Sequence, residues 1–228
     1  MSTIGVLQFG GSNCDLDVKK ALDSLGIDNR LIWYKERDAI DECDAVVVPG
    51  GFSYADYLRA GAIAARDPVM NHVHSLADDG KPVLGICNGA QILCESGIAH
   101  GAYAQNESAK FQCEWTNLRV ETTDAPFTRR FDEGEIIRVP IAHAEGRYVA
   151  QDLNHLIDEN RILFRYVDED GEPTEEANPN GSVHNIAGLL GEHRNVAAMM
   201  PHPERARDSL LGSDDGLRVF EGMAESLV

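Results

Sequence analysis

The sequence predicts an α/β fold with a mainly parallel central sheet, flanked by helices, and an added antiparallel extension. In the first hundred residues, short apolar runs alternate with helical patterns, as in parallel sheets whose strands are joined by helices. In the second half, several segments alternate polar and apolar residues, which is typical of antiparallel strands with one wet face. The chain has no internal repeat and no long linker, so we expect one domain over residues 1–228.

The first half gives the clearer pattern of elements. Apolar β-rich runs predict strands at 4–9, 31–34, 45–48 and 82–86. Apolar residues at helical spacing predict helices over 14–25 and 68–77, and a third helix directly after residue 86, ending near Ser96. The strand at 45–48 is apolar throughout, which indicates burial on both faces, and the Pro-Gly-Gly at 49–51 ends it sharply.

The second half predicts strands at 118–121, 136–141, 161–167, 186–190 and 196–200. We expect Ser213 or Asp214 to cap a last helix that runs to about Leu227. Residues 168–182 are acidic and contain Pro and Gly, so we expect a loop there.

The charge balance limits the function classes. The chain has 20 Lys and Arg against 38 Asp and Glu, a formal net charge of −18 at pH 7. Nucleic acid and anionic membranes are disfavoured as partners because both attract basic surfaces. The acids are dispersed along the chain, so we interpret them as a solvated coat adapted to high salt, with an acidic face for cations or a basic partner as the alternative.

Hydropathy and cysteine usage favour a cytoplasmic protein. No apolar run approaches the roughly 18–20 residues of a membrane span, and the N-terminus does not resemble a signal peptide. The five cysteines are odd in number and no pair has CxxC spacing, so we expect neither a disulfide framework nor a metal site. They are Cys14, Cys43, Cys87, Cys94 and Cys113.

The strongest local signal is GICNG at 85–89, between a predicted strand and a predicted helix. A nucleophile flanked by glycines at such a turn is the arrangement of a nucleophile elbow, here with Cys87 in place of serine. The dipole at the helix N-terminus favours the thiolate, and the Asn88 N–H points toward an oxyanion formed there. The alternative is a small buried cysteine in a Gly-rich turn.

A base and its orienting group follow the last predicted core strand. His202 and Glu204 are two residues apart and flanked by prolines, so an extended segment would place them on one side. A lone loop histidine is more often a surface residue, but with the cysteine elbow upstream a Cys–His–Glu triad is the better hypothesis. PGGF at 49–52 follows another central strand and is either a second oxyanion donor or an ordinary turn.

These motifs together resemble the class I, or triad, glutamine amidotransferases, which have a flavodoxin-like sheet. GICNGAQ at 85–91, MMPHPER at 199–205 and PGG at 49–51 match the three motifs of that family. Further stretches resemble one subfamily, the glutaminase subunits of phosphoribosylformylglycinamidine synthase. They lie at 11–15, 51–54, 56–64, 140–143, 145–148, 164–167 and 178–182.

The resemblance implies a mechanism for the triad. Cys87 would attack the side-chain amide of glutamine, and the N–H groups of Gly51 and Asn88 would stabilise the oxyanion. His202 would pass a proton to the leaving ammonia, with Glu204 orienting the imidazole. The products would be glutamate and ammonia.

The resemblance also implies substrate contacts and partners. Gln91, one helical turn after Cys87, would contact glutamine, and so would Asn106, Ser108 and Phe111 in a further substrate-binding stretch. Ammonia would pass to a larger synthetase subunit that converts formylglycinamide ribonucleotide to formylglycinamidine ribonucleotide, with a small third subunit in the complex. The chain has no GxxxxGK[ST] loop, so ATP and Mg²⁺ are expected on the synthetase and no cofactor on this chain.

Three other interpretations remain open from the sequence. The chain could serve another amidotransferase with a different ammonia acceptor. A cysteine-elbow peptidase or stress protein on a similar sheet needs no His-Pro-Glu after the last core strand. A regulatory module without activity does not need an intact Cys87, His202 and Glu204.

Overall fold

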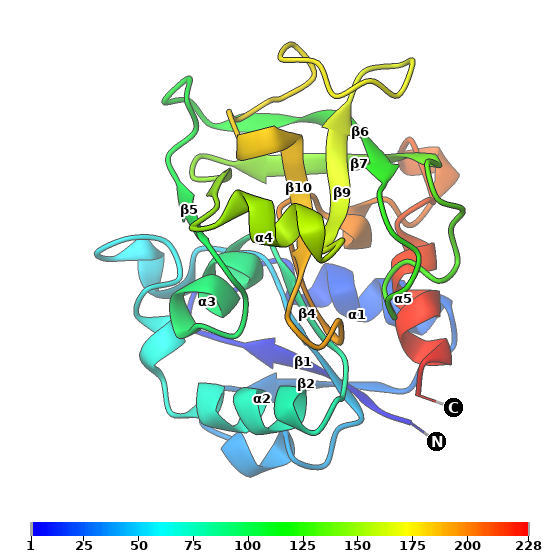
Figure 1. Cartoon of the computed structure of the whole chain (residues 1–228). Coiled ribbons are helices and arrows are strands. Elements are labelled where there is room, and N and C mark those ends of the chain that lie inside the picture. Colours follow the sequence, from blue (N-terminus) through cyan, green and yellow to red (C-terminus); the bar gives the residue numbers. More distant parts are fainter. Residues whose placement is uncertain (1, 228) are drawn as a thin grey trace.

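One nine-stranded sheet organises the molecule, and the computed structural model describes residues 2–227 (Figure 1). The strand order is β2-β1-β3-β4-β11-β10-β9-β6-β7. The first five strands in this order pair in parallel, and the remaining pairs are antiparallel. The strands are β1 (Ile4–Gln8), β2 (Asn29–Trp33), β3 (Ala45–Val48), β4 (Val83–Ile86), β6 (Gln112–Val120), β7 (Ile136–His143), β9 (Ile162–Val167), β10 (Ile186–Leu190) and β11 (Val196–Met199).

Helices cover both faces of the sheet. The apolar sides of α1 (Asp15–Ser24) and α5 (Leu217–Glu225) pack in one core cluster with side chains from one face. Those of α2 (Val69–Asp78), α3 (Asn88–Ser96) and α4 (Leu153–Asp158) pack in a second cluster on the other face. The mainly parallel α/β fold with an antiparallel extension is therefore confirmed.

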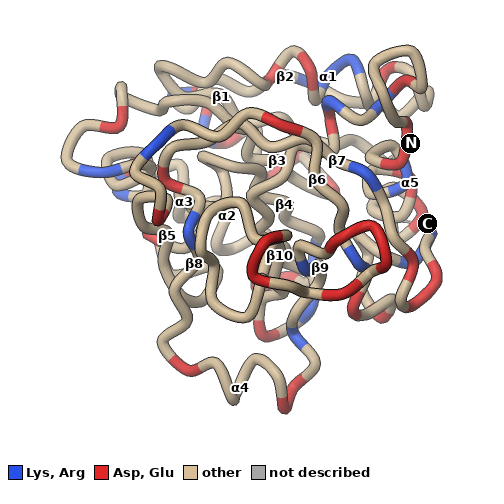
Figure 2. Tube along the Cα trace, turned by 90° about the horizontal axis from the view of Figure 1, so that it is seen from above, with Lys and Arg blue, Asp and Glu red and all other residues tan. Residues whose placement is uncertain are grey.

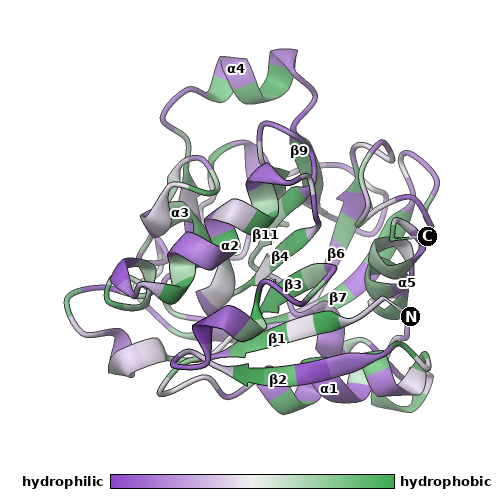
Figure 3. Cartoon of the chain, turned by 90° about the horizontal axis from the view of Figure 1, so that it is seen from below, coloured by the Kyte–Doolittle hydropathy of each residue, from purple (hydrophilic) through white to green (hydrophobic). Residues whose placement is uncertain are grey.

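The strands at the centre of the sheet differ in burial from its last strand, β7, as their sequences predict. Every residue of β3, β4 and β11 is buried, and these apolar strands lie at the centre of the molecule between the helices (Figure 3). Strand β7 alternates between exposed or half-buried and buried positions along its whole length. The alternation follows from strand geometry, since successive side chains point to opposite faces.

Several boundaries and small elements differ from the sequence predictions. Strand β6 begins at Gln112, six residues before the predicted start, because its first half is largely exposed and carries little apolar signal. The predicted cap of the last helix is wrong: the Ser213 hydroxyl accepts a hydrogen bond from the Asp215 N–H in a preceding turn, and α5 begins at Leu217. Three short elements were not predicted: α4, and the separate two-stranded sheet of β5 (Ala102–Ala104) and β8 (Arg147–Val149).

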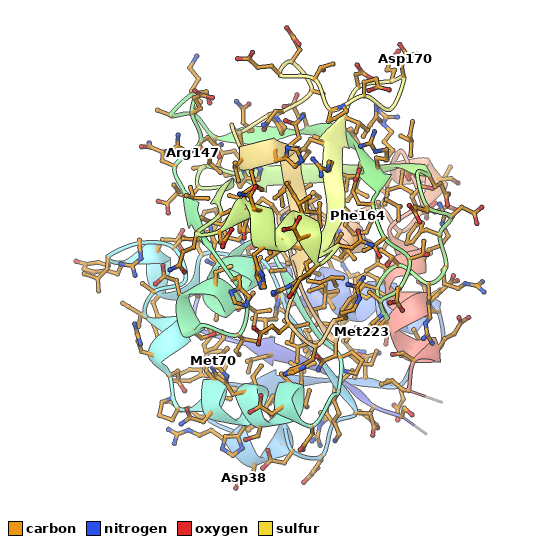
Figure 4. All side chains as sticks on the ribbon, viewed as in Figure 1. Asp38, Met70, Arg147, Phe164, Asp170 and Met223 are labelled. Atoms are coloured by element: carbon orange, nitrogen blue, oxygen red, sulfur yellow. The ribbon has the colours of Figure 1, made fainter. Side chains whose placement is uncertain are left out.

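Acidic side chains lie around the periphery. Figure 2 shows them dispersed along the trace, with several in the loop beside β9. Residues 168–182 form that loop, as predicted, and contain no helix or strand. The labelled Asp38 and Asp170 lie at opposite ends of the molecule (Figure 4). Among residues 2–227, no helix has the length and apolar character needed to cross a membrane.

Candidate active site

The candidate site lies where three neighbouring parallel strands end. Strand β4 pairs with β3 on one side and with β11 on the other. Because parallel strands have their carboxyl ends at the same edge, the segments that follow them converge there. These segments supply Gly51 after β3, Cys87 after β4 and His202 after β11.

Cys87 occupies a strained turn between β4 and α3. Its backbone has φ 50° and ψ −109°, a conformation that non-glycine residues rarely adopt and that costs of the order of 1–3 kcal/mol. The Cys87 N–H donates to the Met199 carbonyl at 2.8 Å, and the Cys87 carbonyl accepts from Gln91 N–H at 3.1 Å. These bonds fix the turn between β11 and the first turn of α3, and they aim the thiol into the site.

The glycines on either side of the cysteine are required by packing. A Cβ atom on Gly89 would lie 1.8 Å from the Val48 carbonyl oxygen, which is an impossible contact. A Cβ atom on Gly85 would lie 2.7 Å from a side-chain carbon of Leu93 and 2.8 Å from the Gly89 backbone. The elbow can therefore approach β3 and α3 this closely only with glycine at both positions.

His202 and Glu204 form a buried pair. The His202 Nδ1 lies 2.6 Å from Glu204 Oε1, and the two residues are 1% and 0% exposed. Burial lowers the pKa of the imidazole, but the negative charges of Glu204 and Cys87 outweigh it, and the net effect raises the pKa well above its ordinary value. The pair does not sit on an extended segment, because Pro203–Arg205 forms a 3₁₀ turn that still brings both side chains together.

The side chains of Cys87 and His202 both lie next to Gly50. A Cβ atom on Gly50 would lie 2.9 Å from His202 Cε1 and 3.4 Å from Cys87 Cβ, so both side chains border the space that the missing side chain leaves. Within residues 2–227, the buried His202 Nε2 has no hydrogen-bond partner and can exchange a proton with a reacting group.

Two backbone N–H groups are available beside the thiol. Gly51 has φ 151° and forms a bridge with Ser12, and its own N–H has no acceptor among residues 2–227. Asn88 is the first residue of α3, where N–H groups have no partner within the helix. These are the two N–H groups that the resemblance implies as oxyanion donors, and that role stays a prediction.

A pocket of about 270 Å³ opens over this edge. Cys87, His202, Gly51, Gln91 and Phe111 all line it. Ligand pockets in proteins run upward from about 300 Å³, so this pocket is small and suits a ligand the size of one amino acid.

The Asn88 and Gln91 side chains support the pocket walls. The Asn88 amide donates to Gln91 Oε1 at 2.9 Å and accepts from the Ser53 N–H at 3.1 Å. The Gln91 amide donates to the Glu145 carbonyl at 2.7 Å. Gln91 therefore borders the pocket while both ends of its amide bond to the protein.

The structure does not bring Asn106 and Ser108 into the pocket. The Asn106 amide is buried and forms four internal hydrogen bonds, to the Lys110 and His143 carbonyls, the Gly146 N–H and the His143 ring. Ser108 is exposed and accepts from the Lys110 N–H at 3.3 Å. Of the predicted stretch, only Phe111 reaches the pocket, at its half-exposed rim.

Asn106 instead belongs to a polar network behind the pocket wall. The His143 Nδ1–H donates to Asn106 Oδ1 at 3.1 Å, and His143 Nε2 accepts from Asn180 at 3.4 Å. Burial, with the nearby positive charge of His202, lowers the pKa of His143 to about 4, so this ring is neutral at pH 7. The network holds the turn at 143–146, which forms part of the pocket wall.

Cys14 brings a second thiol to the site. Its sulfur would lie 3.1 Å from a Cβ atom on Gly50, and it accepts a hydrogen bond from Arg205 at 3.1 Å. Potential metal-ligand atoms of Cys14, His202 and Glu204 lie within 4.8 Å of one another. His202 and Glu204 bond to each other, and Arg205 donates a hydrogen bond to the Cys14 sulfur. These contacts explain why the three side chains lie close together without a metal ion.

The comparisons with known proteins identify the family of this chain. The sequence model of the CobB/CobQ-like glutamine amidotransferase domain matches residues 2–214. The chain is 60% identical over 225 residues to phosphoribosylformylglycinamidine synthase subunit PurQ of Methanosarcina barkeri, covering 97% of each chain. This chain belongs to the PurQ family of glutamine amidotransferases. The predicted family resemblance is thereby confirmed.

Further members of the PurQ family are similar over nearly the whole chain. The PurQ subunit of Natronomonas pharaonis is 53% identical, covering 96% of this chain and 99% of that protein. Among solved structures, that of PurLQS from Thermotoga maritima matches with a TM-score of 0.89 and 42% identity, covering 100% of this chain and 99% of that one.

Sequence reasoning gave no role to several residues that line the pocket. Cys14, Asp56, His143 and Glu145 lie in stretches that carried the subfamily resemblance, and Arg205 lies in MMPHPER. The sequence therefore marks these stretches by their resemblance to the subfamily, but their spacing along the chain does not indicate that they lie close together. Only the packing of the sheet edge brings them together.

Proposed function

We propose that this chain is the glutaminase subunit of phosphoribosylformylglycinamidine synthase. The observation that carries the proposal is the convergence, in one small pocket, of a strained cysteine, a buried His–Glu pair and two free N–H groups. The relatives named above, which are called PurQ subunits of that synthase, support the same assignment.

Each residue of the site has a role in the proposed reaction. The Cys87 thiolate attacks the amide carbon of glutamine, and the N–H groups of Gly51 and Asn88 stabilise the oxyanion, by roughly 3–4 kcal/mol per donor in comparable sites. His202, held by Glu204, gives a proton to the nitrogen as the C–N bond breaks and ammonia leaves. Water then hydrolyses the thioester and releases glutamate.

The proposed site includes the pocket residues Gln91 and Phe111. Gln91 orders the wall beside the substrate, and Phe111 covers the apolar part of glutamine at the rim. For Asn106 and Ser108 we propose support of the pocket wall and of the 106–112 segment, since neither lines the pocket.

The ammonia serves a partner in this proposal. A larger synthetase subunit in the cytoplasm receives it and amidates formylglycinamide ribonucleotide, with a small third subunit in the complex. ATP and Mg²⁺ bind that synthetase, because this chain offers no phosphate-binding loop of the Walker type.

A Cys87→Ala variant tests the proposal in the complex reconstituted with its synthetase. Glutamate release from glutamine is expected to fall below detection, while free ammonia still supports formation of formylglycinamidine ribonucleotide. Cys94→Ala, two turns along α3 and outside the pocket, is the matched control. Glutamine hydrolysis at the parental rate by Cys87→Ala would contradict the nucleophile assignment.

The same assay tests the other ammonia acceptors. If the complex hydrolyses glutamine but forms no formylglycinamidine ribonucleotide, the chain serves a different synthetase. Cleavage of peptides at a rate comparable to that of glutamine would favour a peptidase.

We further propose that the acid-rich surface is an adaptation to high salt. The loop at 168–182 has six acidic residues and no basic one, and only Glu204 among the proposed triad residues is acidic. In this proposal, the acidic residues of the surface interact with the salt solution and take no part in the reaction.

A further inference from the structure

Three charged side chains outside the triad line the pocket. They are Asp56, Glu145 and Arg205. Arg205 donates to the Cys14 sulfur at 3.1 Å. Within the described range 2–227, neither Asp56 nor Glu145 forms an ion pair within 4.0 Å, so two partly buried carboxylates stand unneutralised in a small pocket.

The two carboxylates come from different segments of the pocket lining and influence each other. Asp56 lies in the loop after β3, and Glu145 lies in the turn between β7 and β8. Burial and then the negative charge of Glu145 raise the pKa of Asp56 to about 6, against a hydrogen bond from Asn88 that lowers it. Asp56 is therefore largely ionised at neutral pH, and a cation beside the two carboxyl groups would offset the unfavourable effect of Glu145 on Asp56.

Both carboxylates are held at fixed places relative to the nucleophile. Asn88, the residue after Cys87, donates to Asp56 Oδ1 at 3.3 Å. Gln91 bonds the Glu145 carbonyl, and the Ala60 N–H reaches Glu145 Oε2 at 3.4 Å, which joins the two walls. The Asp56 backbone has φ 52°, as do its neighbours Tyr54 and Ala55 within a few degrees, so the loop adopts an unfavourable conformation to present this side chain.

The same pocket contains an independent sign of a ligand. The His202 residue is 1% exposed and lines the pocket with Cys87, and its Nε2 has no hydrogen-bond partner among the described residues 2–227. We expect a ligand of this pocket to have a polar group that bonds to His202 Nε2. A positively charged group at its other end would then pair with the two carboxylates. Free glutamine has that form, with its amide and its α-ammonium at opposite ends.

We propose that Asp56 and Glu145 together bind the α-ammonium of glutamine, and so restrict the site to the free amino acid. This inference rests on the proposed glutaminase function. An ammonium donates up to three hydrogen bonds, which matches two carboxylates approaching from two walls. Glutamine within a peptide has lost this positive charge and would leave both carboxylates unpaired in the pocket, which binding sites penalise strongly.

The test compares two substrates in the reconstituted complex. Glutamine and 4-carbamoylbutanoate differ only in the α-amino group, and glutamate or glutarate release measures their hydrolysis. For Glu145→Gln and Asp56→Asn, we expect kcat/KM for glutamine to fall about 10- to 100-fold, mainly through KM, while that for 4-carbamoylbutanoate stays within about threefold. Both substitutions keep an oxygen that can accept the existing hydrogen bonds, and Glu114→Gln, on exposed β6, is the charge-matched control.

The outcomes separate this inference from the proposed function. If the parental complex does not hydrolyse glutamine, the proposed function fails and the comparison is not reached. If the parental complex is active but both variants keep its preference for glutamine over 4-carbamoylbutanoate, the α-ammonium site is wrong. An equal loss of kcat/KM for both substrates would also overturn it. The two carboxylates would then stabilise the conformation of the loop and would not bind the α-amino group.

Discussion

The parallel and antiparallel halves of the sheet contribute to the pocket in different ways. Strands β3, β4 and β11 are buried on both faces, so they can present chemistry only where they end. Strand β7 has one accessible face, and with its following turn it supplies a wall held by side-chain hydrogen bonds. The candidate reactive groups thus follow the ends of close-packed strands, whereas a network of polar side chains sets the shape of the pocket wall.

This difference predicts different responses to substitution. The parallel half depends on backbone contacts that leave no space, because adjacent elements touch through glycine. The antiparallel half depends on hydrogen bonds that can be lost singly, so substitutions there should weaken the fold in steps.

The largest expected effect is that of Gly89→Ala. The added Cβ would lie 1.8 Å from the Val48 carbonyl oxygen, so β3 and α3 must separate and the elbow must move. We expect loss of the cooperative thermal transition, measured by circular dichroism, and no glutamine hydrolysis. Gly10→Ala, where nothing lies within 4 Å of the added carbon, is the control, and parental stability of Gly89→Ala would refute the close-packed account.

A smaller effect is expected for Asn106→Ala in the polar network. The change leaves the Gly146 N–H and the His143 carbonyl without their partners, at about 1–3 kcal/mol for each buried group. We expect a loss of about 3 kcal/mol in the free energy of unfolding in urea and a raised KM for glutamine, since the 143–146 turn loosens.

Ser108→Ala provides the comparison for that network. Ser108 is exposed, so its loss should change the free energy of unfolding by less than about 0.5 kcal/mol. Equal effects of the two substitutions would show that the wall does not depend on Asn106.

The smallest expected effect concerns salt and the periphery of the antiparallel half. Repulsion among like charges weakens as salt screens it, so the melting temperature should rise by a few degrees between dilute buffer and molar KCl. Replacing Glu169, Glu172, Glu175 and Glu176 with glutamine in the 168–182 loop should reduce this gain. A melting temperature that is no higher in concentrated KCl would sink the proposed salt adaptation.

Sequence reasoning predicted most closely the fully buried strands, β3 in the parallel half and β10 in the antiparallel half. The apolar run at 45–48 matched β3 to the residue, because burial on both faces leaves an uninterrupted signal. The first half of β6 and the three-residue strands β5 and β8 carry too little pattern to detect. The sequence predicts a cap of α5 at Ser213 or Asp214 because the same residue types, Ser and Asp, are favoured at helix N-caps and in turns.

Local sequence patterns predicted the turn at Cys87 and identified the family. A strand–Gly–x–Cys–x–Gly–helix pattern is local and can be recognised in the sequence alone, although the contact that requires Gly89, with the Val48 carbonyl, belongs to the tertiary structure. Only the tertiary structure decided which other side chains share the pocket. Asp56 and Glu145 are 89 residues apart in sequence numbering and meet because β3 and β7 lead to the same edge, whereas Asn106 turns inward because the 143–146 turn uses its whole amide.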